Sequence, residues 1–145
     1  MKISTKGRYA LRMLLELAQH PENECVSLKE ISEHQGISKK YLEQIVPMLN
    51  KSGLLRTSRG NKGGYMLAKQ PHACTVGDVL RATEGSLAPV ACLEYDVNEC
   101  PRAGYCETLF VWKGLSDAIS GYLDSVTLQD ILDRAAGSGG DDYSI

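Results

Sequence analysis

Apolar residues at helical spacing open the chain. Between residues 8 and 19 they recur at intervals of three and four positions, which predicts one stripe of an amphipathic helix: Ala10, Met13, Leu14, Leu17 and Ala18. Ser27 and Glu30 have the spacing of a capping box, in which each side chain bonds the other residue's backbone amide. This pair predicts the start of a second, short helix that ends at Gly36.

A tight turn and a third helix with a polar outer face follow. Ser38 is the expected N-cap of this helix, and its apolar face consists of Leu42, Ile45 and Leu49. Pro47 lies inside the helix and lacks the amide hydrogen that the helical bonding pattern needs. We therefore expect a kink or a local break there.

The next segment has the pattern of a β-hairpin. Two short strands, at 54–58 and 65–68, flank a loop in which glycines permit positive φ angles. Thr75 then opens a fourth helix, which we expect to extend to about Glu84.

The helical pattern disappears between residues 85 and 106 and returns in a long helix over about 107–125. Thr127 marks the start of a last, short helix. Apolar residues of the long helix are spaced 3, 4, 3 and 4, which is typical of a narrow helix–helix seam rather than of a broad core face: Trp112, Leu115, Ile119, Tyr122 and Val126.

These elements predict a mainly α fold with a small β-hairpin wing: a winged helix-turn-helix plus a long dimerisation helix. We expect the winged helix-turn-helix DNA-binding domain at 1–84 and a cysteine loop at 85–106. The dimerisation helix and the short C-terminal helix follow at 107–135, and a flexible tail at 136–145.

Charge is divided unequally along the chain, although the net charge of the 145 residues is only −2. Residues 1–70 carry 12 of the 16 Lys and Arg and six acids, whereas residues 71–145 carry four basic residues and 12 acids. A basic half in an acidic protein favours contact with a polyanion, although charge alone leaves chance clustering on solvated faces open. Because no signal peptide or apolar membrane span is recognisable, we expect a soluble, cytoplasmic protein.

The chemistry of the expected DNA-facing residues suits nucleic acid. On the third helix Lys39 and Lys40 would neutralise phosphates, and Gln44 and Glu43 would bond base edges. The hairpin tip offers Arg59 and Lys62. Further backbone contacts are expected from the N-terminal segment, namely Lys2, Thr5, Lys6, Arg8 and Tyr9. The alternative is that the lysines only solvate a helix face and that the glycine loop is an ordinary turn.

Five cysteines without an export signal are expected to be thiols, metal ligands or redox groups rather than structural disulfides. Cys92, Cys100 and Cys106 lie in the irregular segment, with seven and five residues between them. Such thiolates are able to wrap one metal centre, but zinc binding, a reversible Cys100–Cys106 disulfide and plain thiols stay open. Cys25 and Cys74 are expected to be buried thiols. The three histidines are scattered and are interpreted as structural or surface residues.

Three motifs are specific enough to suggest a family: Ile31–Ser38, Tyr41–Gln44 and Arg59-Gly60-x-x-Gly63-Gly64-Tyr65. They resemble the IscR, NsrR and CymR group of winged-helix repressors, over residues 1 to about 134. The resemblance implies a dimer built on the long helix and a pseudo-palindromic operator. It also implies DNA contacts from Ser38, Lys40, Tyr41, Glu43, Gln44 and Arg59. No nucleophile–base or nucleotide motif indicates an enzyme.

The same resemblance implies an iron-sulfur cluster held by the three loop cysteines, with 2Fe-2S favoured and 4Fe-4S the alternative. The histidine expected as fourth ligand is replaced by Leu109, and the aspartate that NsrR-like proteins use is replaced by Arg8. Glu107, a residue of a second subunit or an exogenous ligand would have to fill the gap. Such a regulator would control cluster biogenesis or redox and nitrosative stress genes. The alternative is a cluster-free thiol-redox or partner-controlled repressor of the cysteine-metabolism type.

Overall fold

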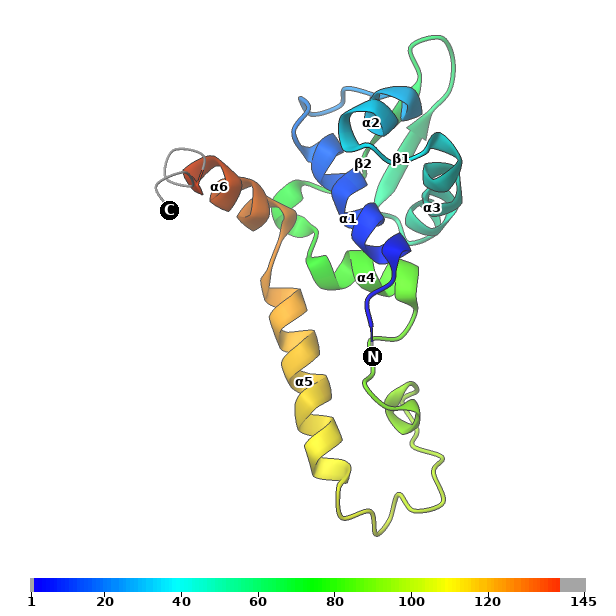
Figure 1. The fold of residues 1–145 in the computed structure, drawn as a ribbon, viewed down its shortest axis with the longest axis vertical. Coiled ribbons are helices and arrows are strands. Elements are labelled where there is room, and N and C mark those ends of the chain that lie inside the picture. Colours follow the sequence, from blue (N-terminus) through cyan, green and yellow to red (C-terminus); the bar gives the residue numbers. More distant parts are fainter. Residues whose placement is uncertain (1, 139–145) are drawn as a thin grey trace.

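Six α-helices and one two-stranded hairpin make up the computed structural model, which describes residues 2–138. The upper body in Figure 1 contains α1 (Thr5–Ala18), α2 (Leu28–Gln35), α3 (Lys39–Lys51), β1 (Leu55–Ser58), β2 (Gly64–Leu67) and α4 (Val76–Glu84). The lower part contains α5 (Leu109–Ser125), and α6 (Leu128–Ser138) extends sideways from the body. The prediction of a winged helix-turn-helix with a long additional helix is confirmed.

Side-chain caps start the helices where the sequence predicted. The hydroxyl of Ser27 accepts a hydrogen bond from the amide of Glu30 at 3.1 Å, although the reciprocal bond of the predicted box is not formed within residues 2–138. Thr75 and Asp78 form a complete capping box at the start of α4. Each cap satisfies amides that the first helical turn leaves without a partner.

Three expectations differ from the structure. The local break expected at Pro47 does not form, and α3 continues to Lys51, because Pro47 lies on the exposed face, where the carbonyl that loses its partner faces water. The helix α5 begins at Leu109 rather than at 107. Residues 136–138, expected as part of the tail, belong to α6, and residues 139–145 lie outside the described residues.

The core lies among α1, α2, α3 and the hairpin, and it also contains Val79 of α4 and Leu128 of α6. Its largest fully buried side chains include Met13, Leu14, Ile31, Leu42, Ile45 and Leu49. A smaller apolar cluster formed by Val76, Leu80 and Leu87 contacts Ile119 and Leu123 of α5. An ion pair between Arg81 and Asp124, with N–O distances of 2.7 and 2.9 Å, joins α4 to α5. Only the C-terminal part of α5 is therefore held against the body.

Along α5, several large apolar side chains are not covered by other parts of residues 2–138. No residue of this helix is buried, and Phe110, Val111, Trp112, Leu115 and Tyr122 are exposed. Ile119 and Val126, the other two seam residues, pack partly against the smaller cluster. Within residues 2–138 no helix is long and apolar enough to cross a membrane.

Gly64 permits a close contact that fixes the wing, because a Cβ there would lie 2.5 Å from the carbonyl oxygen of Val26. The neighbouring Tyr65 exchanges two backbone hydrogen bonds of 2.9 Å with Val26.

We expect Gly64→Ala to lower the free energy of unfolding by about 1–3 kcal/mol, measured by urea denaturation. Gly104→Ala is the control, since nothing lies within 4 Å of its Cβ position. Equal midpoints for the two variants would contradict this role of Gly64.

Candidate nucleic-acid interface and cysteine loop

The helix-turn-helix presents the N-terminal end of α3 to solvent. Gly36 adopts a left-handed conformation, with φ 64°, that ends α2, and the hydroxyl of Ser38 accepts a hydrogen bond from the amide of Tyr41 at 3.1 Å. Four buried residues anchor the inner face of α3: Leu42, Ile45, Val46 and Leu49. The outer face exposes Lys39, Lys40, Glu43 and Gln44, as predicted.

Two tyrosines predicted at the interface also connect α1 with α3. The rings of Tyr9 and Tyr41 pack edge to face, with centroids 5.2 Å apart, and the guanidinium of Arg12 lies 5.4 Å from the centroid of Tyr9. Both tyrosines and Lys6 are only half-buried. Part of each side chain therefore reaches the surface next to α3, and the ring contact orients the two helices relative to each other.

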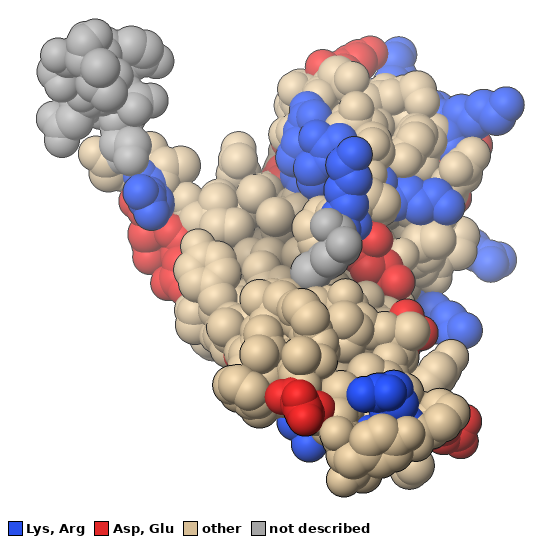
Figure 2. Space-filling model, turned by 60° about the horizontal axis from the view of Figure 1, so that its bottom comes forward, with Lys and Arg blue, Asp and Glu red and all other residues tan. Residues whose placement is uncertain are grey.

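The wing adds basic side chains next to this surface. Arg59 and Lys62 are exposed at the tip of the hairpin, in a turn closed by a 3.0 Å hydrogen bond from the amide of Gly63 to the carbonyl of Gly60. Figure 2 shows Lys and Arg side chains gathered over the upper part and the right-hand edge of the molecule, whereas its lower part carries fewer charged groups, some acidic and some basic. The basic half of the sequence thus forms the surface that carries the exposed end of α3 and the wing.

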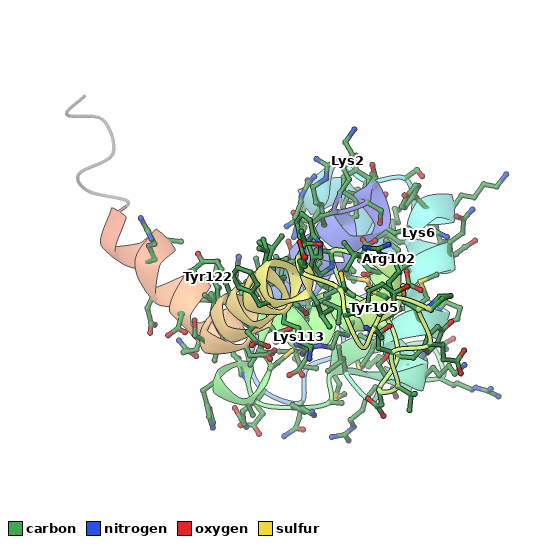
Figure 3. All side chains as sticks on the ribbon, turned by 90° about the horizontal axis from the view of Figure 1, so that it is seen from below. Lys2, Lys6, Arg102, Tyr105, Lys113 and Tyr122 are labelled. Carbon is green, nitrogen blue, oxygen red and sulfur yellow. The ribbon has the colours of Figure 1, made fainter. Side chains whose placement is uncertain are left out.

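The segment between α4 and α5 contains the three predicted ligand cysteines. Cys92 lies in a short 3-10 turn over Ala91–Leu93, and Cys92, Cys100 and Cys106 are all half-buried free thiols. Beside Cys106, the guanidinium of Arg102 lies 5.1 Å from the ring centroid of Tyr105, and Figure 3 shows these two side chains next to each other in the loop. The loop therefore leads directly into the helix that exposes its apolar face.

The Cys106 thiol lies at the start of α5. Its Sγ is 3.5 Å from the hydroxyl of Thr108. This side-chain hydrogen bond, assisted by the backbone at Thr108 and Leu109, lowers the pKa of Cys106 below its usual value. A helix N-terminus and a nearby hydroxyl favour the thiolate, which is the form that binds metals.

The three sulfur atoms do not converge on one point in this conformation. Among residues 2–138, only Glu16, His20 and His34 bring three potential ligand atoms within 4.8 Å of one another. A single zinc ion needs all its ligands on one centre, whereas a cluster distributes its thiolates over more than one iron. The donor set fits a cluster by its chemistry, with three accessible thiols and no competing disulfide among the described residues.

A fourth protein ligand is not supplied at the positions that the resemblance indicated. Leu109 is the first residue of α5 and has an aliphatic side chain. Arg8 is exposed and donates a hydrogen bond to the hydroxyl of Thr5 at 3.2 Å. Glu107 is exposed at the end of the loop and is the nearest carboxylate in sequence to Cys106.

The remaining thiols and histidines lie elsewhere in the fold. Cys74 is buried, as predicted, and burial raises its pKa to about 11. Cys25 was also expected to be buried, but it is only half-buried. Sequence reasoning missed that His20 and His34 both contact Glu16. The spacing of Glu16 and His20 by four residues, at the end of α1 and just beyond it, was the available signal, but no local pattern brings His34 to them.

Comparison with known proteins points to one family. A family model described as Rrf2, an iron-dependent transcriptional regulator, matches residues 3–134. The chain is 40% identical to Protein rrf2 of Nitratidesulfovibrio vulgaris over 136 residues, covering 94% of this chain and 90% of that protein. It is 41% identical to the HTH-type transcriptional regulator CymR of Bacillus subtilis, covering 94% of each. Identity to the regulator IscR of Yersinia pestis is 39%, covering 92% of this chain and 80% of that protein.

Solved structures give the same result. The structure of CymR, described as the global cysteine regulator of B. subtilis, has a TM-score of 0.74 and 38% identity, covering 92% of this chain and 98% of that one. The IscR of T. potens has a TM-score of 0.72 and 39% identity, covering 93% and 88%.

Proposed function

This chain belongs to the Rrf2 family of transcriptional regulators, and from that premise we propose that it is a homodimeric repressor whose affinity for DNA depends on an iron-sulfur cluster. Cys92, Cys100 and Cys106 would hold the cluster. The protein is a regulator rather than an enzyme, and as a regulator that binds DNA it would act in the cytoplasm. The carrying observation is that the cysteine loop leads directly into α5, with its uncovered apolar face.

DNA binding rests on the surface formed by the N-terminal end of α3 and the wing. Exposed lysines beside exposed Gln44 and Glu43 combine phosphate neutralisation with base recognition. Arg59 and Lys62 at the wing tip extend this surface towards a neighbouring groove. The proposed contact residues are Lys6, Tyr9, Ser38, Lys39, Lys40, Tyr41, Glu43, Gln44, Arg59 and Lys62.

A homodimer accounts for the exposed apolar face of α5. Trp112, Leu115 and Tyr122 are 36%, 44% and 69% exposed, which is unusual for large apolar residues in a monomer. Pairing two such helices would bury them and would place two α3 helices on one face of the DNA. A two-fold dimer reads a pseudo-palindromic operator.

The cluster, when bound, would supply a centre that responds to iron, oxygen or nitric oxide. Three loop thiols would hold it, and the hydrogen bond from Thr108 would favour the thiolate of Cys106. A 2Fe-2S centre is favoured over 4Fe-4S, with the fourth position open to Glu107, a second subunit or an exogenous ligand. Ordering of this loop would position the start of α5 and thereby the spacing of the recognition helices.

A second candidate function is a repressor of cysteine metabolism controlled by thiol oxidation or by a partner protein. Leu109 and Arg8 stand where the resemblance indicated the fourth ligand, and a relative described as a global cysteine regulator shares the fold at 38% identity. In that case DNA binding would be unchanged in a protein that lacks all three loop cysteines.

We expect Lys40→Ala to lower the slope of log K against log salt concentration by about one, because one phosphate contact is lost. Gln44→Ala should weaken binding to the preferred sequence by about 10–100-fold and relax specificity at one base pair. Fluorescence anisotropy over a salt series measures both effects. Lys51→Ala is the control, since this exposed lysine lies at the far end of the same helix; a control that behaves like Lys40→Ala would contradict the assignment.

The proposed function is tested most simply by selecting DNA from a random pool with protein purified without oxygen. The result we expect is one pseudo-palindromic sequence whose half-sites lie about one or two helical turns apart. Enrichment of sequences without two-fold symmetry, or of none, would contradict the proposal of a dimeric regulator.

A further inference from the structure

Three potential metal ligands converge between α1 and α2, far along the sequence from the cysteine loop. The Oε2 atom of Glu16 lies 3.0 Å from Nε2 of His20 and 3.0 Å from Nδ1 of His34. All three ligand atoms lie within 4.8 Å of one another. We propose that Glu16, His20 and His34 form a binding site for one zinc ion per chain.

The donor set and its dimensions suit zinc. Two imidazole nitrogens and one carboxylate oxygen are ligands that zinc prefers, and three protein ligands leave a fourth position for water. Zn–N and Zn–O bonds of about 2.0–2.2 Å place two ligands of a tetrahedral ion about 3.3–3.5 Å apart. The two observed O–N distances of 3.0 Å thus require each pair to open by about 0.3–0.5 Å. Rotation of the side chains supplies a movement of this size.

The carboxylate is already oriented for this role. Glu16 is only 5% exposed, and its other oxygen, Oε1, accepts a 2.9 Å hydrogen bond from the side-chain amide of Gln35. Arg12 in turn contacts both the side-chain oxygen and the backbone carbonyl of Gln35. Oε2 is left for His20 and His34, and a ligand held by such partners loses little freedom when a metal binds.

The histidines are placed to complete the site from two elements. His20 follows Glu16 by four residues and lies just beyond the C-terminal end of α1, whereas His34 comes from the last turn of α2. The His34 side chain is 50% exposed, so a metal ion reaches the site from solvent. The ion would join α1 to the end of α2, directly before the turn that positions Ser38 and α3.

The contacts among the three side chains are electrostatic as well as hydrogen-bonded. The hydrogen bond to Glu16, with the nearby charges of Glu16, Glu30 and Glu33, raises the pKa of His34. Burial alone would raise the pKa of Glu16, but hydrogen bonds from His34, Gln35 and His20 together hold it below its usual value.

The chain provides its own control for a direct test, because it contains three histidines and the third, His72, is exposed in the turn Pro71–Ala73. Imidazole C–H resonances of the reduced, full-length protein are followed by NMR during a titration with zinc sulfate at pH 7.5. The expected result is that the signals of His20 and His34 shift together and saturate, while that of His72 does not move. The thermal midpoint should rise by several degrees at saturating zinc.

Variants separate this site from zinc bound by the cysteines. His34→Gln should weaken the zinc affinity measured at the His20 signal by at least about tenfold and should abolish the rise in thermal midpoint; His72→Gln should change neither. The proposal is overturned if zinc does not change the chemical shifts of His20 and His34, or changes them no more than it changes the chemical shift of His72. The three side chains then form only a hydrogen-bonded link between α1 and α2.

Discussion

Replacing Leu115 by glutamate is expected to convert the proposed dimer into a monomer and to weaken operator binding by about 100-fold or more, because the second half-site is no longer held at high effective concentration. Leu115 lies in the middle of the apolar face of α5 and is 44% exposed in the single chain. A charge there costs little in the monomer but would be buried without a partner between two paired helices.

Sedimentation velocity and operator titrations measure the two effects of Leu115→Glu. Lys113→Glu is the matched control, since it places the same side chain on the same helix outside the 3, 4, 3, 4 spacing. A Leu115→Glu protein that is still dimeric, or a monomer that binds the full operator with unchanged affinity, would contradict the role proposed for α5.

Cys106→Ala is expected to have the other large effect: loss of nearly all bound iron and sulfide, with a change in operator affinity of about 5–150-fold. The Cys106 thiol lies beside Thr108 at the start of α5 and would connect the cluster to the dimer helix. The same loss of iron is expected for Cys92→Ala and Cys100→Ala, because each removes one of three thiolate ligands.

Iron and sulfide analysis and anisotropy titrations of the three variants, all without oxygen, measure these effects. Cys25→Ala is the control, as Cys25 is a half-buried thiol outside the loop. Operator affinity unchanged in all three loop variants would favour the cluster-free repressor instead.

Local sequence signals predicted the helix-turn-helix well because its elements are defined by short-range physics. Apolar spacing located α1 and α3, Ser27, Ser38 and Thr75 are the observed N-caps, and the glycine loop marked the hairpin. Pro47 was the exception: its effect depends on whether the helix face is exposed, and that follows from packing rather than from the local sequence.

The parts that sequence could not place depend on contacts between distant residues. The pairing of Glu16 with His34 arises only when α2 packs on α1. Likewise, the spacing of the seam residues predicted a helix–helix contact but not which of them pack within the chain. The structure shows that Ile119 and Val126 also pack against the body. The other three seam residues are left exposed: Trp112, Leu115 and Tyr122. A fourth ligand for the proposed cluster is of the same kind, since a residue of a second subunit is one of the candidates and no local sequence pattern places it.

The central proposal, a cluster on the three loop cysteines, is tested most directly by the iron and acid-labile sulfide content of protein purified without oxygen, together with its visible spectrum. We predict near-stoichiometric iron and sulfide in equal amounts, with charge-transfer bands in the visible range. A colourless protein that contains no iron and is not reconstituted by iron and sulfide would contradict the proposal and leave thiol or partner control of the repressor.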